Sequence, residues 1–380
     1  EYIKRDMTTE NGAFYSSLDA DSNPPEGELE EGAFYVWQKE DLETILKDDF
    51  ELFSDYYNIN NYGFWEHDNY VLIRKDDDAS IIKKHNITLA VLNEKKTAWK
   101  STLLKERNKR AKPRLDDKTL TSWNAIMLKG YVDAYRVLED VDYLASAEKN
   151  ARFIINNMLR EDGGLNHNYK NGKSTINGYL EDYSATIDAF IALYENTLNE
   201  TWLTTARDLT NYTFDHFFDT KSNMFYFTSN EDESLVSRSI EYRDNVIPAS
   251  NSIMAKNLFK LSHYFDNQHY SKTAMRMLNN VKPEMLEYPS GYSNWFDLML
   301  NFAQPFYEVA IVGAEAKQKI AALNKTYLPN KLIAASTSEN IMPLLANRYN
   351  PDNTFIYVCV NKSCKFPVTE VNEAIKFIKE

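Results

Sequence analysis

The feature that most constrains this chain is a run of paired amphipathic helices between residues 120 and 303. Apolar side chains recur there at helical spacing, and short polar connectors join the segments in pairs. Short connectors force the two helices of a pair to run antiparallel. The sequence therefore predicts successive helical hairpins, with helices over 120–138, 143–159, 179–198, 202–218, 249–265, 270–286 and 295–303.

The turns after these pairs also repeat. A Gly- or Asn-rich turn and then an aromatic or apolar residue follow Met158, Phe218 and Leu286, which are 60 and 68 residues apart. The same pattern follows Met7, in the string GAFY at 12–15. We therefore expect the chain to begin at the end of a second helix and to be a piece of a longer protein.

Repeated helical hairpins either stack as an open solenoid or close into a toroid. The segment 179–198 is apolar on most sides, which is typical of an inner helix, whereas the segment 204–215 carries more charge and is expected outside. With only 11 Gly and 11 Pro in 380 residues, long helices are favoured over many short strands. The expected fold is mainly α: an (α/α)6 toroid, incomplete at its N-terminus, over residues 1–304.

The pattern changes after residue 304. The sequence predicts a strand over 308–313, a helix over 314–323, strands over 331–335 and 354–360, and a closing helix over 368–378. Strand, helix and strand in that order predict a small parallel α/β subdomain over residues 305–380.

Charge and cysteine usage restrict the partners. The 43 basic and 56 acidic residues give a net charge of −13, which argues against nucleic acid or an anionic membrane as the main partner. No apolar run approaches the ~18 residues of a membrane span. Two cysteines in 380 residues favour a reducing compartment, so we expect a cytoplasmic protein. Cys359 and Cys364 do not form a CxxC motif, and the sequence leaves a bridge between them open.

Polar and aromatic residues open the predicted inner helices. Parallel inner helices bring their N-termini to one mouth, where helix dipoles and free N–H groups favour anions and polyols. Aromatic rings beside amides and carboxylates are how a protein holds a sugar ring. The expected substrate-binding residues are Trp123, Asn124, Tyr183, Asn251 and Trp295, with Asp19 and Asp21 from an acidic loop.

Carboxylates at the same mouth are candidates for acid–base chemistry. Glu181 and Asp182 begin one inner helix, Asp116 and Asp117 lie just upstream of another, and His167 follows a Gly-Gly turn. A crowded, desolvated carboxylate has a raised pKa, which suits a general acid. We expect Glu181 or Asp182 in that role, Asp116 or Asp117 as the second carboxylate, His167 as a reserve proton carrier, and an acidic cavity.

A simpler interpretation stands beside this one. Asp182 and Ser250 are residue types that dominate helix N-caps, and Trp123, Tyr183 and Trp295 are residue types of ordinary cores. The recurrence of such groups in several repeats favours the functional interpretation.

No metal or cofactor is expected. The acidic loop over 19–31 lacks EF-hand spacing and is interrupted by Pro24 and Pro25. The six histidines lack zinc-site spacing, and no phosphate loop or dinucleotide fingerprint occurs.

Six strings together resemble the DUF255, or YyaL-like, family of thioredoxin-domain proteins, the spermatogenesis-associated protein 20 group. They are GAFYSSLDADS (12–22), GAFYVW (32–37), KPRLDDKTLTSWNAIM (112–127), GYLEDYSATIDAFIALYE (178–195), PASNSIMAKNLFKLS (248–262) and VCVNKSC (358–364). The resemblance implies a six-hairpin barrel similar to that of N-acylglucosamine 2-epimerases and several glycosidases, preceded by a thioredoxin-like domain that this chain lacks. It implies no catalytic residues, and the paired catalytic histidines of the epimerases are not identified here.

Two hypotheses of function follow. The first is a carbohydrate-processing domain, epimerase- or glycosidase-like, that acts on a sugar or a related small molecule through acidic residues at the barrel mouth. The alternative is a non-catalytic binding or scaffold domain that supports an attached thioredoxin-like redox module. Two carboxylates, or a carboxylate and His167, facing one cavity would favour the enzyme.

Overall fold

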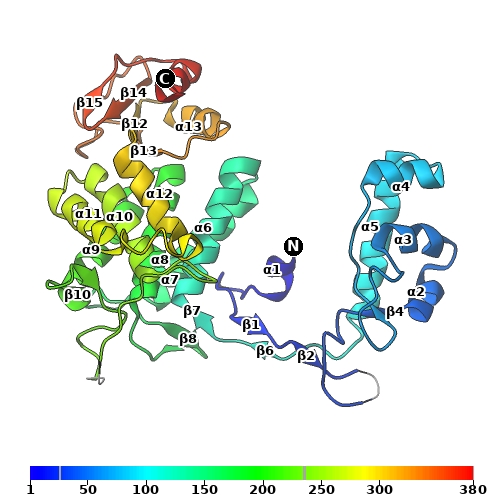
Figure 1. The fold of residues 1–380 in the computed structure, drawn as a ribbon. Coiled ribbons are helices and arrows are strands. Elements are labelled where there is room, and N and C mark those ends of the chain that lie inside the picture. The colour runs from blue at the N-terminus through cyan, green and yellow to red at the C-terminus, as the bar shows by residue number, and fades with distance from the viewer. Residues whose placement is uncertain (25–26, 234–236, 380) are drawn as a thin grey trace. The chain divides into compact units, whose positions relative to one another are not determined.

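The computed structural model describes residues 1–24, 27–233 and 237–379 (Figure 1). The chain forms two compact units, one made of Glu1–Ser16 with Asp117–Glu380 and the other of Ser17–Asp116. We call the first the toroid unit and the second the inserted unit. Each is described by itself.

Helical hairpins form the body of the toroid unit. The helices are α6 (Thr121–Leu138), α7 (Val141–Asn157), α8 (Leu180–Thr197), α9 (Glu200–His216), α10 (Ser250–Tyr264), α11 (Gln268–Val281) and α12 (Ser293–Ala303). α6, α8, α10 and α12 pack side by side in that order, and α7, α9 and α11 pack on the first helix of their own pair (Figure 1). The mainly helical α/α-toroid class is confirmed.

The sharp connections follow from local chemistry. α6 and α8 end at residues in the left-handed conformation, Glu139 (φ 56°) and Leu198 (φ 62°). The next residues, Asp140 and Asn199, cap α7 and α9 with their side chains. One residue thus ends a helix and the following one begins its antiparallel partner.

α8 is an inner helix, as its sequence predicted. Its side chains are buried on nearly every side, including Phe190, Leu193 and Tyr194, which are fully buried. A helix that is apolar all round has to be enclosed by other elements.

The turns after the second helices share one backbone pattern. Antiparallel pairs close them at Thr8–Phe14, Leu159–Leu165 and Phe218–Phe225, the last between β10 (Phe218–Asp219) and β11 (Met224–Phe225). The N–H groups that follow donate back at 2.8–2.9 Å, from Tyr15 to Met7, from Asn166 to Met158 and from Tyr226 to Phe217. α1 (Tyr2–Asp6) therefore occupies the place of the ends of α7 and α9, and the repeat extends to the first residues.

A small antiparallel sheet precedes α6. It contains β7 (Thr119–Leu120), β8 (Asn168–Lys170) and β9 (Lys173–Ser174) in that order. Thr121 N donates to the carbonyl oxygen of His167 at 2.9 Å. This pairing holds His167 at the N-terminus of α6.

The C-terminal part has the predicted elements with a different strand direction. They are β12 (Tyr307–Val312), α13 (Ala316–Asn324), β13 (Lys331–Ser336), β14 (Phe355–Val360), β15 (Ser363–Cys364) and α14 (Val371–Lys379); a 3-10 turn, η2 (Pro289–Tyr292), precedes α12. The sheet order is β13-β12-β14-β15. β12 and β13 are parallel, as expected, but β14 runs antiparallel to β12, so the sheet is mixed. The wholly parallel arrangement was wrong because no crossover helix joins β13 to β14.

Side chains of the inner helices cover the outer edge of β13. Ile333 N donates to Glu195 Oε1 at 3.1 Å, and Tyr264 Oη donates to the carbonyl oxygen of Ile333 at 2.9 Å. Cys359 and Cys364, which lie opposite each other on β14 and β15, form a disulfide. The division into residues 1–304 and 305–380 as domains stays a prediction.

The inserted unit has its own apolar core, built on Trp37, Leu42, Phe53 and Trp99. Trp99 Nε1 donates to Asp49 Oδ2 at 3.0 Å. Its elements are β1 (Ser17–Leu18), β2 (Asp21–Ser22), β3 (Glu30–Glu31), β4 (Trp37–Gln38), α2 (Lys39–Leu46), η1 (Lys47–Asp49), α3 (Phe50–Tyr57), β5 (Asn69–Tyr70), α4 (Asp78–His85), α5 (Leu89–Arg107) and β6 (Leu115–Asp116).

Within the described parts of the chain, no helix is both long enough and apolar enough to cross a membrane.

Candidate active site

Asp182 lies where the N-termini of α6 and α8 meet, and its side chain is fully buried. Its Oδ1 accepts a hydrogen bond from Ser122 N at 2.8 Å, and its Oδ2 accepts one from Tyr179 N at 2.9 Å. His167 Nδ1 lies 2.9 Å from the same Oδ2. One carboxylate therefore satisfies free N–H groups of two helix starts and holds an imidazole.

Glu181 precedes Asp182 on α8 and is only partly buried. Burial raises the pKa of Glu181 to about 7, and the charges of Asp182 and Glu241 act in the same direction. Among the described residues Glu181 has no salt-bridge partner. A carboxyl group that is half protonated near neutral pH can donate a proton in one step and accept it in another.

Burial also shifts the pKa values of the two titratable neighbours of Glu181, Asp182 and His167. It raises the pKa of Asp182 and outweighs the hydrogen bonds from His167 and the two backbone N–H groups. For His167, burial by itself lowers the pKa, but the hydrogen bond to Asp182 and the charges of Asp182 and Glu181 raise it above its ordinary value. The three groups form what we call the mouth cluster: His167, Glu181 and Asp182.

The mouth cluster also satisfies a geometric criterion for metal binding. One ligand atom from each of the three side chains lies within 4.8 Å of the others, and no other such trio occurs in residues 1–24, 27–233 and 237–379. Both Asp182 oxygens already accept backbone N–H groups, which favours proton handling over cation binding. The expectation that the chain binds no metal or cofactor stays a prediction.

Two carboxylates near this mouth were missed by sequence reasoning. Glu241 Oε2 accepts a hydrogen bond from Ser250 N at 3.0 Å, at the start of α10. Asp244 joins α10 to α12, because it accepts hydrogen bonds from Ala249 N at 3.0 Å and Asn294 N at 2.9 Å. Both lie in the irregular loop before α10, and only the repeated need for anions at helix starts pointed to them.

Asn124 and Asn251 are at equivalent places, but their amides bind backbone. Asn124 accepts from Phe14 N at 2.8 Å and donates to the carbonyl oxygen of Phe14 at 3.0 Å. Asn251 makes the same two contacts with Phe225, both at 2.9 Å. Both asparagines are buried. Each clamps the turn of the preceding hairpin onto an inner helix.

Tyr183 takes this position on α8. Its hydroxyl oxygen accepts a hydrogen bond from Leu165 N at 2.8 Å, and its ring stacks on Tyr212 with centroids 5.4 Å apart. Trp295 is also fully buried and donates from Nε1 to the carbonyl oxygen of Tyr242 at 2.7 Å. Both rings belong to the core, so their predicted substrate contacts have no support in the geometry.

Trp123 is placed differently, because 46% of it is exposed. It lies one turn from Ile126 on α6, and Ile126 lines the central cavity. Among the aromatic residues predicted at the helix starts, Trp123 is the one that offers a ring to a ligand.

Of the remaining predicted acids, one lies in the toroid unit and three lie in the inserted unit. Asp117 is partly buried and pairs with Lys170 at 2.5 Å. Asp116, Asp19 and Asp21 belong to the inserted unit, and there Asp116 pairs with Ser17 and Asp21 with Glu31 in short strands. Residues 25 and 26 of the acidic loop lie outside the described residues.

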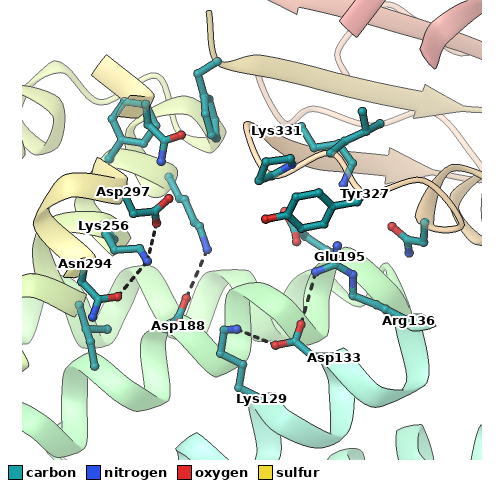
Figure 2. Close-up of a pocket in the computed structure, with 18 of the residues that line it drawn as sticks. Lys129, Asp133, Arg136, Asp188, Glu195, Lys256, Asn294, Asp297, Tyr327 and Lys331 are labelled. Carbon is teal, nitrogen blue, oxygen red and sulfur yellow. Dashed lines mark hydrogen bonds and ion pairs between the residues drawn. The ribbon is translucent and has the colours of Figure 1, made fainter. Parts of the chain in front are cut away.

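A cavity of about 710 Å³ lies between the inner helices (Figure 2). We call it the lumen. It is lined by α6, α8, α10 and α12 and by the segment 324–331 of the C-terminal part. On α8 the lining residues Ala185 and Asp188 follow Glu181 at i+4 and i+7, which places all three on one face of the helix. Glu181 therefore stands at the end of the stripe that faces the lumen.

The residues expected to line an acidic cavity at the helix starts do not line the lumen, and the lumen itself is not acidic. Among its described lining residues, six are basic and four are acidic: Lys129, Arg136, Lys256, Lys260, Lys325 and Lys331 against Asp133, Asp188, Glu195 and Asp297. The basic residues come from deeper turns of α6 and α10 and from the C-terminal part, beyond the first turns in which the sequence placed the site residues.

No family model matches this chain. It is similar to human spermatogenesis-associated protein 20, with 24% identity over 100% of this chain and 53% of that protein. An uncharacterised protein of Caenorhabditis elegans is 25% identical over 98% of this chain and 55% of its own length. The chain thus spans about half the length of the curated relatives it matches.

Solved structures with a likeness to this chain include sugar-active enzymes. A GH76 α-mannanase from Bacteroides thetaiotaomicron has a TM-score of 0.41 and 14% identity, and covers 60% of this chain and 64% of its own. A sugar epimerase from a ruminal bacterium has a TM-score of 0.38 and 16% identity, over 46% and 47% of the two chains. At these levels the likenesses carry no argument about chemistry.

Proposed function

We propose that the toroid unit is a carbohydrate-processing domain of the epimerase or glycosidase type, with Glu181 as its general acid. The observation that carries the proposal is a carboxyl group with a pKa of about 7 at the lumen-facing start of α8, beside a His167–Asp182 pair. A sugar reaction of either type needs a proton delivered to, or taken from, an oxygen or carbon of the ring.

Each residue then has one role. Glu181 exchanges the proton with the substrate. Asp182 fixes the His167 ring through Nδ1, which leaves Nε2 to exchange protons as a second acid–base group. The exposed ring of Trp123 supports one face of the sugar.

The test is a turnover screen on a panel of neutral and acidic mono- and disaccharides, followed by NMR for epimer formation and by a reducing-sugar assay for cleavage. On any substrate found, Glu181→Gln is expected to lower kcat by about 100-fold or more. The rate of the native chain should fall as the pH rises through about 7, because Glu181 then loses its proton.

The matched control is Glu161→Gln, a change of the same kind at an exposed residue of the same unit. It should leave kcat and the melting temperature unchanged. An active Glu181→Gln variant, or a panel without turnover for the correctly folded chain, would contradict the proposal.

The scaffold alternative is favoured by one observation. Asn124, Asn251, Tyr183 and Asp182 all bind the backbone of other segments, as expected of purely structural residues. On this alternative the toroid unit supports an attached thioredoxin-like module, and no sugar is turned over.

A further inference from the structure

Among the described residues that line the lumen, Lys331 is a lysine without an ion-pair partner. Lys331 begins β13, and its side chain is largely shielded from water. In residues 1–24, 27–233 and 237–379, no carboxylate lies within ion-pair distance of its Nζ. Burial lowers the pKa of Lys331 to about 8, and Arg136 and Lys260 add to this effect, against the opposing charge of Glu195.

The other lumen charges are mostly paired. Asp188 pairs with Lys260 at 3.3 Å, and Asp297 pairs with Lys256 at 2.6 Å. Asp133 is shared by Lys129 at 2.7 Å and Arg136 at 3.4 Å (Figure 2). Each lumen aspartate is thus already matched by a cation.

Glu195 does not supply the missing partner. Its Oε1 accepts hydrogen bonds from Tyr264 Oη at 2.9 Å and Ile333 N at 3.1 Å, which fix the carboxylate against the edge of β13. Figure 2 shows Arg136, Tyr327 and Lys331 near one another at this end of the lumen. We call these three residues the basic end.

A surplus of positive charge here is unexpected for a chain with a net charge of −13. Holding a cation away from water without a counter-charge is unfavourable. An anionic group on a ligand would remove that cost and gain charge-assisted hydrogen bonds from Lys331 and Arg136. Tyr327, which is 88% exposed, adds a hydroxyl donor at the rim.

We infer that the basic end of the lumen binds an anionic group, a phosphate or a carboxylate, carried by a sugar-like ligand. The sugar part of this inference rests on the proposed function; the anion site does not. Lys331 and Arg136 would then hold the charged group. Arg136 follows Trp123 on α6 by roughly 20 Å, at about 1.5 Å per residue, so the same ligand reaches Trp123 and Glu181 only through an extended sugar part.

The experiment is isothermal titration calorimetry of the whole chain with four probes: glucose, glucuronate, glucose 6-phosphate and inorganic phosphate. At least one anionic probe should bind at least tenfold more tightly than glucose. Tighter binding of glucuronate assigns the site to a carboxylate, and tighter binding of glucose 6-phosphate or of inorganic phosphate assigns it to a phosphate.

Lys331→Met keeps the length of the side chain and removes its charge. It should weaken binding of the preferred anion at least tenfold while glucose binding stays unchanged, and Arg136→Gln should weaken it in the same direction. Lys376→Met, at an exposed lysine of α14, is the control and should have no effect.

The outcomes separate the two proposals. Turnover of neutral sugars without preference for any anionic probe overturns the anion site and leaves the proposed function standing. Lys331-dependent anion binding without turnover of any sugar supports the anion site and overturns the proposed function. Equal losses in Lys331→Met and Lys376→Met would show a general charge effect and overturn the anion site.

Discussion

The mouth cluster stands at the start of α8, whereas the basic end combines Arg136 of α6 with Tyr327 and Lys331 of the C-terminal part, and the two carry opposite charges. At the mouth, burial and neighbouring acids raise the pKa of Glu181 to about 7. At the basic end, burial and neighbouring cations lower the pKa of Lys331 to about 8. The same physical cause, loss of hydration beside charges of the same sign, therefore raises the pKa of an acid and lowers the pKa of a base, so that both values approach neutral pH.

The comparison also separates two kinds of buried charge. Asp182 is fully buried but receives two backbone N–H groups and His167, so the fold depends on it. Glu181 and Lys331 have no salt-bridge partner among the described residues, so the fold bears a cost for them. A buried charge without a partner lowers the stability of the fold, and such charges are candidates for ligand binding.

The largest expected effect is that of Asp182→Ala. The change leaves two helix-start N–H groups and a buried imidazole without their acceptor, so the free energy of unfolding should fall by about 3–5 kcal/mol. Urea denaturation measures it. Asp142→Ala, whose side chain is 75% exposed, should change stability by less than about 0.5 kcal/mol. Similar values for the two variants would refute the structural role of Asp182.

Substitutions of the two asparagines that clamp the turns at the mouth should have the next largest effect on stability. Asn124→Ala and Asn251→Ala each leave a buried backbone N–H and C=O unpaired, at Phe14 and Phe225 respectively. Each should lower the free energy of unfolding by about 2–3 kcal/mol. Both asparagines bind the N–H and C=O of one phenylalanine, and Asn124 in addition accepts from Asn150 Nδ2 at 2.9 Å. The two losses should therefore agree within about 1 kcal/mol, with the larger one at Asn124; a larger loss at Asn251 would contradict the equivalence of the two turns.

At the basic end, Lys331→Met should raise the free energy of unfolding, whereas the substitutions of Asp182 and of the two asparagines lower it. The folded pKa of about 8 lies below the unfolded value of about 10.4, so the unfolded chain binds more protons between these values. The charged Lys331 therefore destabilises the folded chain fully below pH 8, and this destabilisation disappears as the pH rises toward about 10.4. We expect Lys331→Met to stabilise the chain by about 1–3 kcal/mol at pH 7, with the gain shrinking above pH 8. A loss of stability at pH 7 would contradict an unpaired charge.

Glu181→Gln should give the smallest effect and the mirror-image pH dependence. The folded pKa of about 7 lies above the ordinary value of 4.5 for a glutamate, so the free-energy cost of the charge is absent below pH 4.5 and fully present above pH 7. Because the side chain is partly exposed, we expect a gain of about 1–2 kcal/mol at pH 8. Melting curves from pH 4.5 to 8 measure this gain. A gain that does not depend on pH would show that it does not come from the charge of Glu181.

Much of the fold was predictable because its signals are local. The spacing of apolar residues set the seven helices to within a few residues, and the Gly- or Asn-rich turns identified the repeat back to Met7. The inserted unit was not recognised, because its short strands and mixed helices show no repeat. The antiparallel direction of β14 depends on pairing with β12, which lies more than forty residues earlier in the chain.

By itself, the sequence determined where helices begin and that acids, amides and aromatic rings gather at those starts. Only the tertiary structure decided what each group does there. Asp182 is a cap because Ser122 N, sixty residues away, reaches it, whereas Glu181 lies one residue earlier and lacks such partners. The lumen is basic because faces of four helices and the segment 324–331 meet there. A side chain's pKa and hydrogen bonds depend on neighbours that are distant in sequence, and only folding brings them together.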